Sequence, residues 1–228
     1  MTPAPHIVLL GDSIFDNSAY TGGEPDVATH LRRIVPAEWR ATLCAVDGAT
    51  TSGIRSQVKR TPADATHLVV SVGGNDALGY VDLLSRRVES TAAALQLFAA
   101  PLDRFALDYE DAIGIVARLG KPLIVCTIYN GRLERSVATP ARIALGLFND
   151  VIQRAANQHH ATIIELRSIC NEPGDYANPI EPSGPGGLKI ARAVAAAVES
   201  AAASAAISSR GDEGRIAAAA GDPAERAP

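Results

Sequence analysis

The sequence lacks any long apolar run that would place part of it in a membrane. No stretch approaches the roughly 18 apolar residues of a membrane span, and the apolar run at residues 7–10 is too short for a signal peptide. We therefore expect a protein that has no membrane partner and stays in the cytoplasm.

Basic residues are too few and too dispersed to form a surface for nucleic acid. Lys and Arg number 21 against 25 Asp and Glu, which gives a net charge of −4, and the two signs are mixed along the chain. A phosphate backbone is neutralised by a stripe or cluster of Lys and Arg. Nucleic acid is therefore not an expected partner.

Cysteine is also sparse. The three residues Cys44, Cys126 and Cys170 are odd in number and lack the spacing of metal ligands. Two of them lie in apolar, strand-like runs, where a thiol behaves as a small hydrophobic group. The sequence therefore predicts neither a disulfide framework nor a zinc site.

What the sequence does contain is an alternation of short apolar runs with longer amphipathic stretches. This alternation is typical of βα units that feed one parallel sheet, and 228 residues suit one large α/β core. The predicted strands cover residues 6–10, 41–46, 67–72, 122–128 and 161–166. The predicted helices cover residues 25–35, 53–59, 81–99, 103–119, 140–158 and 186–202, with Pro140 at a first helical position and Gly120 closing the preceding helix.

The last part of the chain has a different composition. From about residue 201 it consists mainly of Ala, Ser, Gly and Pro with isolated charges, so it offers too little apolar surface to offset the entropy of ordering. We therefore predict one domain at residues 1–203 and a low-complexity, disordered tail at residues 204–228.

Turn-rich polar segments follow the first three predicted strands. The first strand ends at Gly11-Asp12-Ser13, the second leads to Gly48, and the third leads to Asn75. In a parallel sheet the carboxyl ends of the strands meet at one edge, where ligands bind. A serine hydroxyl with nearby N–H donors supplies the nucleophile and the oxyanion stabilisation that acyl transfer needs.

These segments resemble the sequence blocks of the GDSL or SGNH hydrolase superfamily. Residues 11–13 match its Gly-Asp-Ser block, Gly48 its second block, and residues 73–76, Gly-Gly-Asn-Asp, its third. The resemblance implies a three-layer α/β/α sandwich around a five-stranded parallel sheet, the flavodoxin-like fold of that superfamily, without cofactor or metal. It also implies that Ser13 is the nucleophile and that the N–H groups of Ser13 and Gly48 and the side chain of Asn75 form the oxyanion hole.

The fourth block of that superfamily is Asp-x-x-His before the last helix, and here this chain departs from the pattern. The matching segment, residues 178–184, reads Asn-Pro-Ile-Glu-Pro-Ser-Gly. By the resemblance, Glu181 takes the place of the histidine base and Asn178 the place of the carboxylate that orients it.

A glutamate can act as this base if its surroundings raise its pKa. The unperturbed pKa of Glu is ~4.3 against ~6.5 for His, a deficit of roughly 3 kcal/mol in proton affinity. Burial beside Pro179, Ile180 and Pro182 would raise the pKa of Glu181, and the Asn178 amide could donate a hydrogen bond to its carboxylate. The alternative is that Glu181 is a solvated loop charge or a helix cap, and Asn178 an ordinary turn residue.

The remaining polar residues are assigned lesser roles. Asp12 and Asp76 are expected to hold loops through bonds to the backbone, and Asp16 and Asn17 are weak candidates for the pocket wall. The histidines are expected to lie away from Ser13, inside the first helix or near the starts of strands: His30, His6, His67, His159 and His160.

Together these residues indicate an esterase or acylhydrolase of a small-molecule ester, with small acyl or carbohydrate esters as the expected substrates. Ser13 would form an acyl-enzyme and Glu181 would move the protons. Two alternatives use the same pocket: a catalytically silent binding protein, and an acyltransferase that passes the acyl group to an alcohol or amine.

Overall fold

A computed structural model describes residues 3–219 of the chain, with side chains as far as residue 202. The predicted tail at residues 204–228 lies beyond the last described side chain, and residues 220–228 lie outside the described residues altogether. No helix among the described residues is long and apolar enough to cross a membrane.

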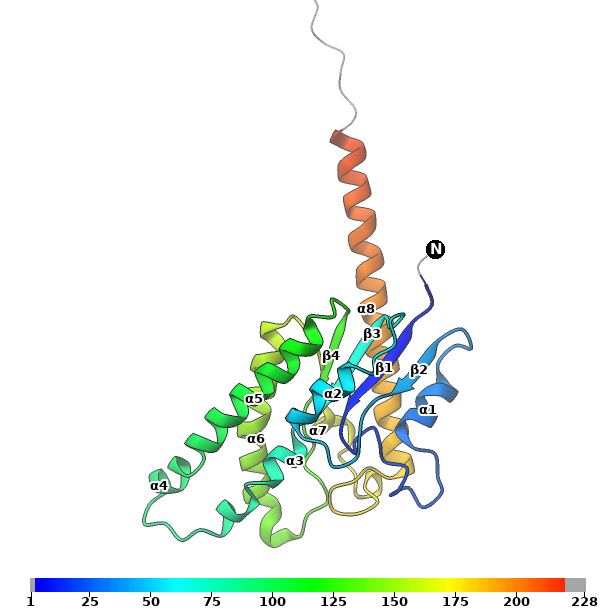
Figure 1. Cartoon of the computed structure of the whole chain (residues 1–228). Coiled ribbons are helices and arrows are strands. Elements are labelled where there is room, and N and C mark those ends of the chain that lie inside the picture. Colours follow the sequence, from blue (N-terminus) through cyan, green and yellow to red (C-terminus); the bar gives the residue numbers. More distant parts are fainter. Residues whose placement is uncertain (1–2, 220–228) are drawn as a thin grey trace, which may run out of the picture.

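The core of the structure is a parallel sheet of five strands in the order β2-β1-β3-β4-β5 (Figure 1). Its strands are β1 (His6–Gly11), β2 (Arg40–Leu43), β3 (His67–Ser71), β4 (Leu123–Cys126) and β5 (Thr162–Ile164). In the sheet, β2 lies on one side of β1 and β3 lies on the other side, so the direction in which the chain adds strands reverses at β1. A crevice for ligands is expected at such a point, outside the carboxyl ends of the strands.

Helices cover both faces of the sheet (Figure 1). Alternate strand residues serve the two layers: Val8 and Leu10 of β1 pack in one apolar cluster, and Ile7 and Leu9 pack in the other. Strands that are buried on both faces need continuous apolar runs, as the sequence of β1 provides. The predicted three-layer α/β/α fold is thereby confirmed.

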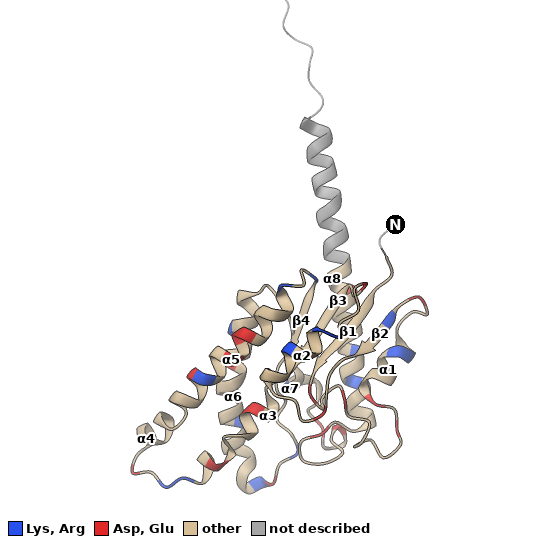
Figure 2. Ribbon diagram, in the orientation of Figure 1, with Lys and Arg blue, Asp and Glu red and all other residues tan. Residues whose placement is uncertain are grey.

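One helical layer contains α2 (Ile54–Val58), α5 (Ala99–Ala117) and α6 (Arg135–Gln158), which pack on the same side of the sheet. The other contains α1 (Val27–Ile34), α7 (Leu166–Ile169) and α8 (Gly184–Ala219), with α1 packed against α8. Shorter elements lie in the connections: α3 (Gly74–Leu78), α4 (Thr91–Gln96), and the 3₁₀ turns Thr51–Gly53, Val81–Ser85 and Pro173–Asp175. Figure 2 shows acidic and basic residues interspersed along α5 and α6.

Two predicted helices start or continue differently from the sequence prediction. The segment predicted as one helix at 81–99 is divided into three parts: the 3₁₀ turn Val81–Ser85, an exposed link at residues 86–90, and the separate helix α4. Helix α4 begins where the Ser90 hydroxyl accepts a hydrogen bond from Ala93 N–H at 3.1 Å. The helix predicted to begin at Pro140 begins at Arg135, so Pro140 lies inside α6. Pro140 is the sixth residue of α6, so it lacks the N–H that would bond to the residue four positions earlier, yet the helix continues through it.

The ends of β1 and β3 approach each other closely at Gly11. This residue has φ of 132°, and a Cβ there would lie 1.8 Å from the carbonyl oxygen of Ser71, so no other residue fits. The buried Gln57 side chain pairs with both backbone groups of Gly11, accepting from its N–H and donating to its C=O at 2.7 Å each. These contacts hold the strand end that carries Ser13.

Candidate active site

Ser13 lies at the carboxyl end of β1, in the crevice that the strand order predicts. Its side chain is only 7% exposed, and the preceding residue is fixed to β3 by a bond from Asp12 N–H to Ser71 C=O at 3.0 Å. Among the described residues the Ser13 N–H has no hydrogen-bond partner. Ser13 therefore presents both a hydroxyl and a free N–H at this edge of the sheet.

Glu181 reaches Ser13 from a loop 168 positions later in the sequence. The Ser13 hydroxyl donates to Glu181 Oε1 at 3.1 Å, and Glu181 is 6% exposed. Its second oxygen, Oε2, is buried and makes no hydrogen bond within the described part of the chain. One carboxylate oxygen thus engages the hydroxyl, and the other remains free to accept a second proton donor.

The surroundings of Glu181 strengthen it as a base. Burial raises the pKa of its carboxyl above the ordinary value, the nearby negative charge of Asp47 acts in the same direction, and the hydrogen bond from Ser13 opposes them. A carboxylate with a raised pKa accepts a proton more readily. The sequence prediction that burial raises the pKa of Glu181 therefore agrees with its place in the structure.

Asn178 makes a different contact from the one expected. Its Oδ1 accepts hydrogen bonds from the N–H groups of Ile180 and Glu181, each at 2.9 Å, which closes a turn. The expected donation from its amide to the Glu181 carboxylate is not among the contacts of the described residues. The expectation that Asn178 orients the Glu181 carboxylate is therefore wrong. Because its oxygen binds the backbone, Asn178 is a turn residue that shapes the loop carrying Glu181, which was the alternative interpretation.

The predicted oxyanion donors are only partly brought together. The Asn75 amide donates to Ala49 C=O at 2.9 Å, which fixes its position, and its second hydrogen remains for a ligand. Asn75 lines the same cavity as Ser13 and Glu181. Gly48, with φ of 72°, is exposed and is not among the residues that line this cavity.

Two further carboxyl groups support the site through the backbone, as predicted. Asp12 accepts from Ile14 N–H at 3.1 Å, and Asp76 accepts from the N–H and hydroxyl of Thr51. Asp12 is 3% exposed, and burial, with the charges of Glu181 and Asp76 adding to it, raises its pKa to about 7. Near neutral pH, Asp12 is therefore partly protonated.

Two residues, Asn17 and Tyr129, hold the loop that carries Glu181. The fully buried Asn17 donates to Pro182 C=O at 3.1 Å and accepts from Val27 N–H at 3.0 Å, so it joins the segment after Ser13 to the residue after Glu181. The Tyr129 hydroxyl donates to Ile180 C=O at 2.5 Å on the other side of Glu181. Asn17 was a weak candidate for the pocket wall, but it is not among the residues that line the cavity.

None of the histidines lines the cavity of Ser13. At the starts of their strands, His6 bonds to Asp64 and Thr42, and His67 bonds to Thr66. His159 bonds to Glu110 at the end of α6. The expectation that histidines lie away from Ser13 therefore agrees with these positions.

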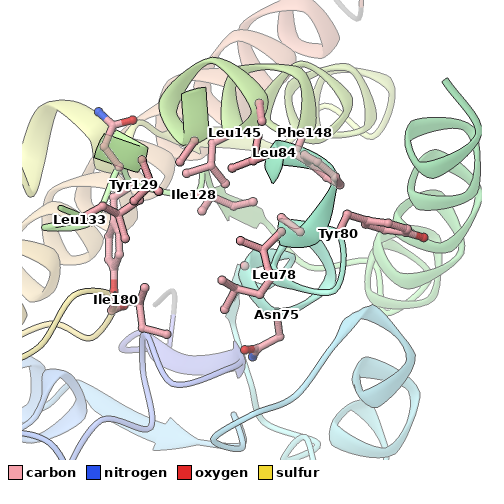
Figure 3. Close-up of a pocket in the computed structure, with 18 of the residues that line it drawn as sticks. Asn75, Leu78, Tyr80, Leu84, Ile128, Tyr129, Leu133, Leu145, Phe148 and Ile180 are labelled. Carbon is pink, nitrogen blue, oxygen red and sulfur yellow. Dashed lines mark hydrogen bonds between the residues drawn. The ribbon is translucent and has the colours of Figure 1, made fainter. Parts of the chain in front are cut away.

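The cavity beside Ser13 has a volume of about 410 Å³ and is walled by α3, the 3₁₀ turn at 81–85, the end of β4 and the first half of α6 (Figure 3). Most of its lining side chains are apolar. Among the described residues, no group of three or more His, Cys, Asp or Glu residues is placed to hold a metal ion.

Comparison with known proteins agrees with this architecture. A model of the GDSL-like lipase/acylhydrolase family matches residues 9–207, whereas no curated protein sequence matches the chain significantly. The structure is similar to an extracellular lipase from Streptomyces rimosus at 15% identity and a TM-score of 0.62, covering 86% of this chain and 99% of that chain.

Two further solved structures show the same arrangement. Phospholipase A1 from Streptomyces albidoflavus NA297 is 16% identical with a TM-score of 0.64, covering 86% of this chain and 99% of that chain. Axe2, an acetylxylan esterase from Geobacillus stearothermophilus, is 16% identical with a TM-score of 0.61, covering 87% of this chain and 96% of that chain. At these identities the likeness shows the fold.

Proposed function

The chain belongs to the GDSL-like lipase/acylhydrolase family, and from this premise we propose that it hydrolyses esters with Ser13 as nucleophile and Glu181 as base. The observation that carries the proposal is the buried hydrogen bond from Ser13 Oγ to Glu181 Oε1 at 3.1 Å. This is the geometry in which a base takes the proton of an attacking hydroxyl. The esterase and lipase activities in the names of the structural neighbours support the general reaction.

The first half of the reaction forms an acyl-enzyme. Ser13 Oγ attacks the ester carbonyl carbon while its proton passes to Glu181, and the carbonyl π electrons move onto oxygen. The Ser13 N–H and the Asn75 amide then stabilise this oxyanion. When the intermediate collapses, the bond to the alcohol oxygen breaks and the leaving alkoxide takes the proton from Glu181.

The second half returns the enzyme to its starting state. A water molecule gives a proton to Glu181 as its oxygen attacks the acyl carbon, and collapse of this second intermediate returns the proton to Ser13 Oγ. While Ser13 is acylated, Glu181 Oε1 no longer receives the serine hydroxyl and can accept a hydrogen bond from that water. The carboxylic acid then leaves.

The proposed base sets the direction of the pH dependence. Glu181 must be ionised to accept a proton, so hydrolysis rises with pH through its pKa. Because burial raises this pKa above the ordinary value for Glu, the rise is expected at a higher pH than for a solvated glutamate, and acidification below it abolishes activity.

The test compares wild type, Ser13→Ala, Glu181→Gln and Glu38→Gln in the hydrolysis of p-nitrophenyl butyrate across pH 4 to 9. Gln keeps the size of Glu but accepts no proton. We expect Ser13→Ala and Glu181→Gln each to lower kcat by about a thousandfold or more. The control Glu38→Gln removes an exposed carboxyl outside the cavity and should leave the profile unchanged.

Two outcomes contradict the proposal. Full activity in Glu181→Gln together with loss in Ser13→Ala would show that another group moves the proton. Equal rates in all four proteins would show that no Ser13-dependent hydrolysis occurs, which leaves the pocket as a binding site.

A further inference from the structure

We infer that the cavity beside Ser13 holds the acyl part of the substrate and that this part is an uncharged, medium-length hydrocarbon chain. This inference rests on the proposed function, because Ser13 must be the attacking group for the cavity to select an acyl chain. It also narrows the sequence expectation, which named small acyl and carbohydrate esters together.

The wall of the cavity is apolar over most of its extent. It is built by segments far apart in the sequence that converge on one space (Figure 3). The apolar residues that line it are Ile14, Val72, Ala77, Leu78, Val81, Leu84, Phe98, Ile128, Leu133, Val137, Pro140, Ala141, Ala144, Leu145, Phe148 and Ile180. Such a wall gains free energy by covering hydrocarbon and offers few partners for the hydroxyl groups of a sugar.

The reacting groups lie at one end of this space. In Figure 3, Asn75 and Ile180 lie on one side of the cavity, and Leu84, Leu145 and Phe148 lie on the opposite side. Ile180 directly precedes Glu181, whose carboxylate accepts from the Ser13 hydroxyl, so the reacting groups belong to the side of Ile180. An ester carbonyl held by Asn75 therefore has an apolar chamber extending away from it. A chain attached to the carbonyl carbon can enter this chamber without bending back toward solvent.

The volume sets the length of the chain. A cavity of about 410 Å³ holds at most roughly fourteen groups of the size of a water molecule or a methylene, at about 30 Å³ each. An acetyl group would leave most of the apolar wall uncovered. The volume therefore favours acyl chains of roughly 8 to 12 carbons.

The charged residues of the wall exclude an anionic substrate end. The described residues that line the cavity include three carboxyl side chains, Asp12, Asp82 and Glu181, and no Lys, Arg or His. A carboxylate at the far end of the acyl chain would meet the negative charge of these side chains without any positive partner. The occupying chain therefore carries no negative charge, and the apolar wall favours a chain without a positive charge as well.

The mouth of the cavity is apolar as well. Leu78, Val81, Val137 and Ile180 line the cavity and are also exposed to solvent. Large apolar side chains at the rim of a pocket commonly mark a place where an apolar ligand enters. The rim and the chamber thus present one continuous apolar path to Ser13.

The test measures kcat/KM for p-nitrophenyl esters from acetyl to dodecanoyl. Burial of each methylene is worth up to about fourfold in binding, so octanoyl should exceed acetyl by at least about fiftyfold, with no further gain beyond roughly twelve carbons. An octanoyl ester that carries a terminal carboxylate should be at least about tenfold slower than the plain octanoyl ester.

A pair of variants ties this selectivity to the cavity. Ala144→Phe fills part of the chamber from α6, so the octanoyl and decanoyl esters should lose at least about tenfold in kcat/KM while the acetyl ester keeps its rate. The control Ala100→Phe makes the same exchange at an exposed position of α5 outside the cavity and should change neither. Ser13-dependent hydrolysis without a preference for long chains, or with a preference for acetyl, overturns the inference.

A binding measurement separates this inference from the proposed function. In the Ser13→Ala protein, whose turnover should be about a thousandfold or more below that of wild type, calorimetry should show decanol binding at least about tenfold more tightly than hexanol, with Ala144→Phe removing the difference. If no ester is hydrolysed but this binding is seen, the catalytic proposal fails and the apolar cavity stands as a chain-binding site. If decanol and hexanol bind alike, the inference fails whatever the activity.

Discussion

Asp12 makes the stability of this protein depend on pH, and Asp12→Asn should remove that dependence. The Asp12 carboxyl is 3% exposed, and Ile14 N–H donates to it at 3.1 Å. Burial is the main cause that raises its pKa to about 7, from 3.8 in the unfolded chain, and the charges of Glu181 and Asp76 add to it. The folded protein therefore holds this proton more tightly than the unfolded chain does.

The sign of the effect follows from linkage. The stabilisation by the proton on Asp12 is fully present below pH 3.8 and is lost as the pH rises through about 7. A difference of about three pKa units corresponds to about 4 kcal/mol of unfolding free energy. Asn is neutral at every pH, has nearly the same shape, and can still accept from Ile14 N–H, so it avoids this loss.

The assay is urea unfolding of wild type and Asp12→Asn at pH 4, 5.5, 7 and 8.5. The two proteins should have similar unfolding free energies at pH 4. As the pH rises, the unfolding free energy of the variant should exceed that of wild type by a growing amount, up to about 4 kcal/mol at pH 8.5, with an unchanged m-value. The control Asp111→Asn removes an exposed carboxyl paired with Arg55, and its small effect should not vary across this range.

Parallel stability curves for wild type and Asp12→Asn between pH 4 and 8.5 would refute the reasoning. They would show that the Asp12 carboxyl ionises in the folded protein as it does in the unfolded chain. A variant that is less stable than wild type at pH 8.5 would refute it as well, because the carboxylate would then be a favourable group.

Two other predictions test the supports of the site. Gln57→Leu keeps the side-chain volume but leaves the buried N–H of Gly11 without an acceptor, while the Gly11 C=O keeps its bond from Val46 N–H. Thermal or urea unfolding should therefore show a loss of about 1–3 kcal/mol in unfolding free energy; a loss below about 0.5 kcal/mol would contradict this. Asn17→Ala breaks the link to Pro182 beside Glu181, so kcat for the butyrate ester should fall at least about tenfold. The measurement is made at a temperature where circular dichroism shows that the variant is fully folded. An unchanged kcat would exclude the positioning role of Asn17.

The sheet could be predicted from the sequence because its strands are buried on both faces. The runs that became β1, β3 and β4 each contain a continuous apolar stretch, at residues 7–10, 68–70 and 123–126, a pattern that few other elements require. The segment at 81–99 carried no comparable signal: Arg86 and Arg87 lie in an exposed link, so no apolar stripe fixes a helix there. Instead, the Ser90 cap sets the start of α4. The residues before it, in the 3₁₀ turn at 81–85, line the cavity.

The site divides in the same way between what local sequence determines and what the three-dimensional arrangement determines. The position of Ser13 follows from its place after a buried strand, whereas the apolar neighbours of Glu181 left two alternatives open, a buried carboxyl with a raised pKa and a solvated loop charge. The role of Asn178 did not follow, because its side chain offers a donor and an acceptor in one group, and only the turn decides that the oxygen binds the backbone. The cavity was least predictable, because its wall combines α3 and the 3₁₀ turn at 81–85 with the first half of α6. The sequence therefore indicates the reacting groups, whereas the chamber proposed for the acyl chain becomes visible only when these separate segments are placed around one space.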